Sequence, residues 1–115
     1  MMSDQDRKIK VLKFSDVLRA ASVASVIVSY YGDGDEGRAE PPQFHDSDGS
    51  PIESLRVPEN ATNTLGDLLE GFAPEGYEDG EGGHGTVTLD VQTGKILVEH
   101  NWYELVSNPA DPREI

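Results

Sequence analysis

Strict alternation of apolar and polar residues in the last third of the chain constrains the fold more than any other feature of the sequence. Residues 86–91 read Thr-Val-Thr-Leu-Asp-Val, and residues 96–103 return as a second apolar-rich run after a glycine-containing turn. A period of two places successive side chains on opposite faces of a strand. The pattern predicts an antiparallel hairpin whose inward face carries Val87, Leu89 and Val91.

A dense run of β-branched and aromatic residues at 23–31 predicts the central strand of the sheet, paired on both sides. It ends at the glycine-rich stretch 32–37, which is typical of a hairpin loop. Residues 38–45 are expected to return as its partner. Pro41 and Pro42 place that partner at a sheet edge, because proline has no N–H to donate to a ladder.

Two shorter segments extend this part of the predicted sheet. Residues 46–49 form a second turn signal, and residues 52–57 alternate apolar with polar side chains, as a half-buried strand does. Together with the strands before them they predict a meander.

Apolar residues at three- and four-residue intervals predict two helices. The first covers residues 4–22, with Ser15 as the N-cap of a shorter alternative. The second begins within residues 60–64 and ends before Pro74. The expected core gathers apolar residues of both helices and the last hairpin: Val17, Leu18, Leu68, Leu69, Phe72, Val87, Leu89 and Val91.

These elements predict one α+β domain over residues 1–115, with an antiparallel sheet of four to five strands and two helices on one face. A chain of 115 residues is near the commonest domain size and buries one core. Frayed ends are expected at residues 1–8 and 106–115, where the chain is polar. Residues 75–85 form a long glycine-rich connection.

The absence of cysteine removes disulfides, thiolate zinc sites and cysteine nucleophiles from consideration. Residues 1–10 lack the apolar centre of a secretory signal, and no apolar run approaches the roughly 20 residues that span a bilayer. We therefore expect a cytoplasmic protein without membrane contact.

General acid–base catalysis near neutral pH would need one of the three histidines, which are His45, His84 and His100. None stands near a nucleophile in a known motif, and a zinc site made of all three would need three separate elements to converge. Residues 82–85 lack the Lys-Ser or Lys-Thr pair of a phosphate-binding loop. We expect no enzymatic activity, no cofactor and no metal.

Acidic residues dominate the charge of the chain, whose formal net charge is −13. Residues 33–82 carry fourteen acids and two bases, whereas residues 1–20 carry three acids and five bases. Binding to DNA or RNA needs clustered Lys and Arg, so nucleic acid is not an expected ligand. A field of this sign attracts basic protein surfaces.

Calcium binding is the alternative use of the acids, because residues 32–37 and 46–49 combine glycine with carboxylates. Neither loop has the spacing of an EF-hand: counted from Asp33, the positions for its glycine and its last carboxylate hold Arg38 and Phe44. The two loops could still pool their carboxylates across the meander. A calcium- or small-ligand-binding module therefore remains open.

Three segments of the chain form a recognisable combination. An aromatic strand runs into a glycine-aspartate loop at 30–37, an aromatic and glycine-rich segment occupies 76–85, and Asp90, Gly94 and His100 follow. Over roughly residues 15–105 the chain resembles a family of small acidic proteins of unknown function carried on bacterial plasmids and phages. The resemblance implies one fold and a mobile-element setting, and no catalytic role, because none is assigned in the family.

Two acid-rich segments, residues 33–40 and 75–81, flank predicted strands. Antiparallel pairing is therefore expected to bring them to one edge of the sheet. The predicted partner-binding residues are Asp33, Asp35, Glu36, Glu40, Glu75, Glu78, Asp79 and Glu81. The predicted function is that of an acidic interaction module. It mimics nucleic acid and blocks a basic nucleic-acid-binding effector, as small anti-CRISPR and anti-restriction proteins do.

Overall fold

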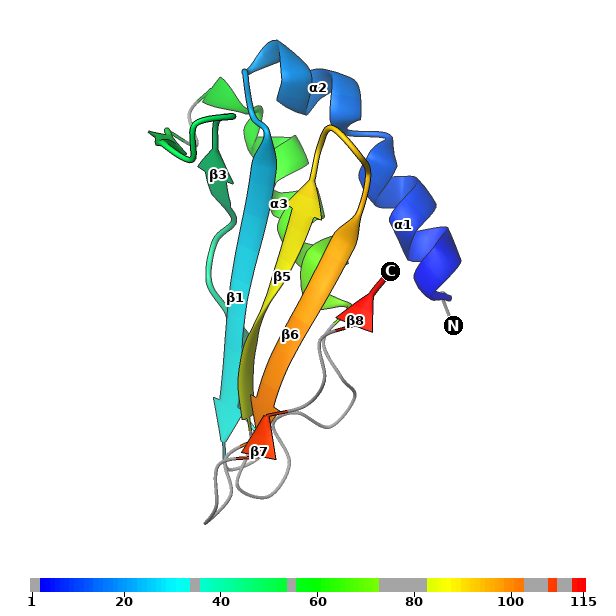
Figure 1. The fold of residues 1–115 in the computed structure, drawn as a ribbon, viewed down its shortest axis with the longest axis vertical. Coiled ribbons are helices and arrows are strands. Elements are labelled where there is room, and N and C mark those ends of the chain that lie inside the picture. The colour runs from blue at the N-terminus through cyan, green and yellow to red at the C-terminus, as the bar shows by residue number, and fades with distance from the viewer. Residues whose placement is uncertain (1–2, 34–35, 54–55, 73–82, 103–107, 110–112) are drawn as a thin grey trace.

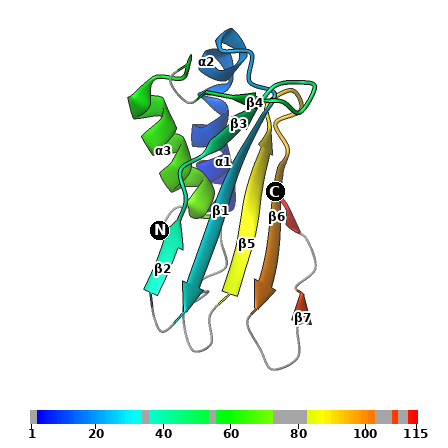
Figure 2. The same cartoon turned by 90° about the vertical axis from the view of Figure 1, so that its left-hand side faces the viewer.

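The protein folds into an antiparallel sheet with helices on one face (Figure 1, Figure 2). The computed structural model describes residues 3–33, 36–53, 56–72, 83–102, 108–109 and 113–115. The helices are α1 (Asp4–Leu12), α2 (Ser15–Ala20) and α3 (Glu59–Glu70). The strands are β1 (Ser25–Asp33), β2 (Glu36–Ala39), β3 (Gln43–His45), β4 (Pro51–Ile52), β5 (Gly83–Asp90), β6 (Ile96–Trp102), β7 (Asn108–Pro109) and β8 (Arg113–Glu114).

The strand order in the described part of the sheet is β4-β3-β1-β5-β6-β7, with β2 also paired to β1 and β8 to β6. Every pairing is antiparallel. Three of these strands, β4, β7 and β8, are two residues long, and the other five form the body of the sheet. The predicted α+β class, with a sheet of four to five main strands, is confirmed.

Strand β1 is central, as its composition predicts. It pairs with β5 along one side and with β3 and then β2 along the other. The predicted return strand over 38–45 is in fact two strands, because Pro41 and Pro42 interrupt the ladder between them. Strand β2 forms the predicted hairpin with β1, with Asp33 opposite Glu36.

The predicted helix over 4–22 is divided into α1 and α2. Helix α1 begins at Asp4, inside the range expected to fray, because the Ser3 hydroxyl accepts a hydrogen bond from Asp6 N at 3.1 Å and caps it. A tight bond from Phe14 N to Val11 O, 3.1 Å, ends α1. In α2 the inward position belongs to Leu18, whereas Val17 is 36 % exposed and does not belong to the core.

Helix α2 ends in a Schellman motif. Ser22 has a φ of 63°, its N–H donates to Arg19 O, and Val23 N donates to Leu18 O. Leu18 and Val23 are both buried, which is the apolar contact that accompanies this motif. The motif turns the chain from α2 into β1.

Helix α3 begins one residue before the predicted range, directly after Pro58, which occupies the N-cap position without a side-chain bond. Leu65, Leu69 and Phe72 are fully buried, while Leu68 is only partly buried against the core. Helix α1 packs beside α3, where the Arg7 guanidinium carbon lies 5.4 Å from the centre of the Phe72 ring. The second predicted helix is confirmed.

The core lies between the sheet and the helices. Val28, Val87 and Val98 are opposite one another on β1, β5 and β6, and all three are buried. Leu89 and Val91 are also buried, so the inward face predicted for the last hairpin is confirmed. Alternate residues of these strands point to the other face, which none of the described helices covers in Figure 2.

Two segments differ from their predictions. The strand expected over 52–57 is limited to β4, since Arg56 N turns back to donate to Glu53 O at 3.1 Å. The C-terminal residues, expected as a polar tail, contribute β7 and β8 to the edge of β6, and Ile115 N donates to Ile96 O at 2.7 Å. Ile115 also packs against the core.

Candidate functional site

One end of the sheet gathers the strand ends next to both acid-rich segments. There β1 and β6 finish and β5 begins, with Gly32 opposite Gly83 and Gly83 opposite Trp102. We call it the glycine end; it is the lower end of the sheet in Figure 2. Gly83 is the first described residue after the acid-rich segment 73–82.

The predicted partner-binding residues are not all at one place. Asp33 and Glu36 are cross-strand partners at the glycine end. Glu40 is exposed and lies opposite Ser29, to whose carbonyl its N–H donates at 2.8 Å, so it is about 13 Å along β1 from Asp33. The others lie outside the described residues: Asp35, Glu75, Glu78, Asp79 and Glu81.

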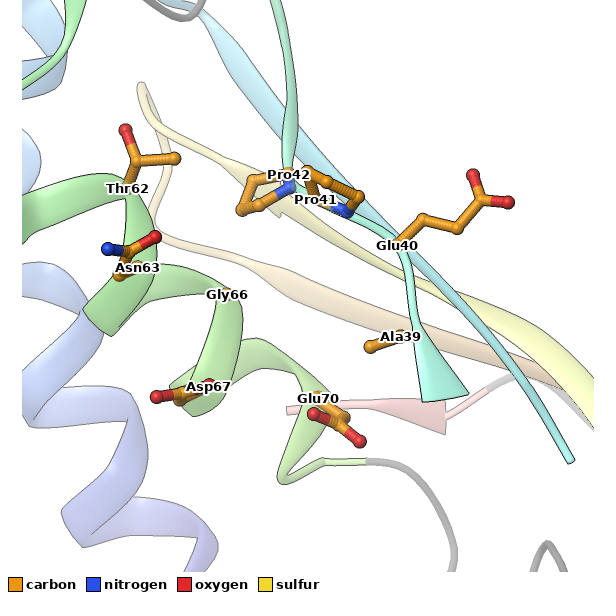
Figure 3. Close-up of a pocket in the computed structure, with 9 residues that line it drawn as sticks. All are labelled: Ala39, Glu40, Pro41, Pro42, Thr62, Asn63, Gly66, Asp67 and Glu70. Carbon is orange, nitrogen blue, oxygen red and sulfur yellow. The ribbon is translucent and has the colours of Figure 1, made fainter. Parts of the chain in front are cut away.

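Glu40 lies instead beside a pocket of about 410 Å³ between α3 and the segment that joins β2 to β3 (Figure 3). In the close-up, Pro42 points toward α3 and the Glu40 side chain points away from it. Pro42 fits there because residue 66 is glycine: a Cβ at Gly66 would lie 3.2 Å from a Pro42 ring carbon. The lining residues are Ala39, Glu40, Pro41, Pro42, Thr62, Asn63, Gly66, Asp67 and Glu70.

Asp67 and Glu70 were missed as candidate residues by the sequence reasoning. Both belong to the polar face of α3, and together with Asn63 they recur at intervals of four and three residues. That spacing places them on one face of a helix, and the sequence alone could have identified them as a polar group. That they line one pocket with Glu40 could not be predicted, because it depends on how the segment after β2 crosses α3.

Buried polar groups meet on the core face near the glycine end. The Tyr30 hydroxyl and His100 Nδ1 are hydrogen-bonded at 2.8 Å, and the two rings are stacked with centroids 5.6 Å apart. The residue between them on β5 is Gly85, where a Cβ would lie 2.5 Å from the Tyr30 hydroxyl oxygen. Burial lowers the pKa of His100, and the positive potential of His84 lowers it further.

The three histidines do not share a site. His45 lies opposite Ser25 at the start of β1, and His84 lies opposite Tyr31 near its end. His100 is on the core face. Within the described ranges no three His, Cys, Asp or Glu side chains are grouped as metal ligands would be.

Asp33 and the turn at 46–49 lie at opposite ends of β1, so the described carboxylates of the two loops are not pooled, a possibility that the sequence left open. The turn at 46–49 follows His45, which is opposite Ser25, whereas Asp33 ends the strand. Nine residues of β1 span about 26 Å, and calcium binds its oxygens at about 2.4 Å. Asp46 Oδ1 instead accepts bonds from Asp48 N and Ser50 N, each at 2.9 Å, within its own turn.

Two basic side chains of the described residues bind backbone carbonyls rather than carboxylates. Lys8 Nζ donates to Ile115 O at 2.9 Å, and an Arg19 guanidinium nitrogen donates to Val91 O at 3.4 Å. The ion pairs between described residues are short-range or peripheral: Arg7 with Asp4 at 3.6 Å, and Lys95 with Glu114 at 3.5 Å.

Comparison with known proteins leaves the site to be interpreted from its own residues. No protein-family model, curated protein or solved structure matches the chain. The resemblance to plasmid- and phage-encoded acidic proteins therefore stays a prediction. In the part of the chain that the structure describes, no helix is long and apolar enough to cross a membrane.

Proposed function

We propose that the protein is an acidic interaction module that binds a basic protein surface. Its partner is a nucleic-acid-binding effector, and the module occupies the basic groove where that effector binds DNA or RNA. The observation that carries the proposal is the pairing of Gly32 with Gly83, which joins the ends of two acid-rich stretches at one end of the sheet.

Covalent geometry limits how far the acids next to these glycines can be from each other. Glu81 is two residues from Gly83, so its Cα is within about 7 Å of the Gly83 Cα. Asp33 is the residue after Gly32, and Gly32 is directly opposite Gly83. Chain connectivity therefore limits the Cα atoms of Asp33 and Glu81, 48 residues apart in sequence, to a separation of at most about 16 Å.

Internal ion pairs cannot neutralise the charge of the chain, because its 22 acids outnumber its nine Lys and Arg residues. The formal net charge is −13, and the described bases Lys8 and Arg19 bond backbone carbonyls rather than carboxylates. Gathered like charges repel, which lowers stability. A partner's Lys and Arg side chains relieve that repulsion and speed encounter.

Salt and nucleic acid together test this function. The protein, immobilised and incubated with lysate of bacterial cells, is expected to retain a basic nucleic-acid-binding protein at about 0.05 M salt and to release it by about 0.5 M salt, since exposed charges are then screened. Duplex DNA or structured RNA added at low salt is expected to compete, because it occupies the same groove.

Two results would reject the proposal. Retention that does not change between low and high salt would show that charge is not the source of binding. A partner retained equally with and without nucleic acid would bind outside the groove. Addition of calcium serves as the control for the alternative function: a rise in melting temperature of several degrees would favour a calcium-binding module.

A further inference from the structure

The face of the sheet opposite the helices contains a shallow pocket near the glycine end. It has a volume of about 410 Å³ and lies over β1, β5 and β6. Tyr31 and Glu99 flank it from β1 and β6, the two strands on either side of β5. Its other lining residues are Ser29, Tyr30, His84, Gly85 and Thr86, of which Ser29, Gly85 and Thr86 are small and His84 is exposed.

Both flanking side chains are accessible to a partner. Tyr31 is 44 % exposed and Glu99 is exposed. Tyr31 is opposite His84, and Thr86 is opposite Glu99, so the ring and the carboxylate are in neighbouring rows of the sheet. Within the described residues Glu99 takes part in neither of the two ion pairs.

We propose that this pocket receives an arginine side chain of the basic partner, which rests on the function proposed above and gives it a specific anchor. Strands β1 and β6 are two inter-strand spacings apart, about 9.6 Å. A guanidinium stacks within about 6 Å of an aromatic ring centre and bonds a carboxylate at about 2.8 Å. Tyr31 and Glu99 are also one row apart along the strands, about 7 Å, so their Cα atoms are about 12 Å apart, and a guanidinium between the ring and the carboxylate can bridge this gap.

Arginine fits this pocket better than the other candidate groups. Its planar guanidinium stacks on a ring and bonds a carboxylate through two parallel N–H groups, which an ammonium group cannot do. Glu99 and a net charge of −13 repel phosphate and other anions. The small side chains of Ser29 and Thr86 allow the guanidinium to approach the sheet closely beside His84.

An NMR titration with a defined probe tests the pocket directly. The ¹⁵N-labelled protein is titrated with a blocked peptide of arginines alternating with glycines, and in parallel with its lysine and citrulline counterparts. The arginine peptide is expected to shift the amides of Ser29, Tyr31, Thr86 and Glu99. The lysine peptide should shift them only at higher concentration. The neutral citrulline peptide should not shift them.

Two variants and a matched control localise the binding. Tyr31→Leu is expected to weaken binding at these amides about two- to fivefold, the range of an exposed cation–π contact. Glu99→Gln is expected to weaken it about two- to fivefold, the upper part of the range for an exposed ion pair. Asp48→Asn removes one exposed carboxylate at the other end of β1 and should leave the affinity unchanged. Unaltered amide shifts of Val28 and Val87 in each variant establish that the sheet is intact.

The possible outcomes distinguish failure of the arginine pocket from failure of the proposed function as an acidic interaction module. If the arginine peptide shifts amides beside Asp33 and Glu36 but not those of the pocket, the arginine pocket is rejected and the proposed function as an acidic interaction module is retained. If Glu99→Gln and Asp48→Asn weaken binding equally, or lysine binds as tightly as arginine, the stacked site is also rejected. If the peptide shifts no amide, both proposals fail.

Discussion

The Tyr30 hydroxyl is hydrogen-bonded to His100 Nδ1 across a glycine, at a distance of 2.8 Å. Gly85 lies between them in the register of β1, β5 and β6, and its missing side chain leaves the room in which the two rings stack. The contact connects the strands that end or begin at the glycine end. It is therefore part of what holds the proposed binding end together.

Gly85→Ala is expected to destabilise the protein by at least about 2 kcal/mol, since overpacking a filled site costs about 1–3 kcal/mol. A Cβ there would collide with the backbone carbonyl of Glu99 and with the Tyr30 hydroxyl, and a backbone neighbour cannot move away cheaply. Urea unfolding measures the change. Thr86→Ala, the adjacent position on the other face, serves as control and should cost under about 1 kcal/mol. Equal costs at the two positions would refute the crowding at Gly85.

Stability is expected to fall as the pH drops below 6.5, the ordinary pKa of histidine, because burial and His84 hold the pKa of His100 lower in the folded protein. The unfolded chain then binds a proton that the folded protein does not, which favours unfolding. The stability that His100 contributes in its neutral form is complete above pH 6.5. It is lost between that pH and the lowered pKa of His100 in the folded protein. Urea midpoints at about pH 8 and about pH 5 measure it.

The matched variant for this pH effect is His100→Gln. All other titrating groups are shared with the wild-type protein, so the difference between the two pH profiles isolates His100. The variant is expected to lose less stability on acidification. Parallel profiles would contradict the assignment.

Ser22→Gly is expected to stabilise the protein by about 0.5–1 kcal/mol. Ser22 is exposed with a φ of 63°, a left-handed conformation that costs an L-residue energy and that glycine adopts freely. Ser22→Ala, which keeps the Cβ, should give no such gain. Thermal unfolding of the three proteins checks this, and a destabilised glycine variant would contradict the Schellman geometry.

Leu69→Ala is expected to cost about 2–5 kcal/mol, because the side chain is fully buried between α3 and the sheet. Val17→Ala should cost less than about 1 kcal/mol, since Val17 is 36 % exposed. Chemical denaturation of both variants measures the difference. A loss below about 1 kcal/mol for Leu69→Ala would place Leu69 at the surface.

Local sequence patterns predict those strands whose residues are selected by burial within one segment of the chain. The alternation of 86–91 and the β-branched run before Tyr31 predict β5 and β1 correctly, because burial of one or both strand faces selects those residues. Strands β7 and β8 follow no such pattern. They exist through pairing with the free edge of β6, which no short segment encodes.

The site could be predicted only in part, for a similar reason. That acids flank the end of β1 and the start of β5 is visible in the sequence, but the adjacency of Gly32 and Gly83 depends on the register of two strands far apart in the chain. Glu40 was grouped with Asp33 because they are close in sequence. The return of β2 carries Glu40 away from the glycine end and toward α3.

The central claim is that the acids next to the glycine end bind the basic partner. Its most direct test is the rate at which the recovered partner associates with two charge variants. Glu78→Gln, Asp79→Asn and Glu81→Gln combined remove three carboxylates next to Gly83. Asp48→Asn, Glu53→Gln and Glu59→Gln combined remove the same charge from exposed sites elsewhere.

At about 0.05 M salt, where exposed charges are screened least, the first variant is expected to associate about tenfold more slowly than the wild-type protein, and the second to remain within about twofold. Both should retain the wild-type fold by circular dichroism. Equal association rates for the two variants would contradict the claim, because the charge next to the glycine end would then have no role beyond its contribution to the net charge.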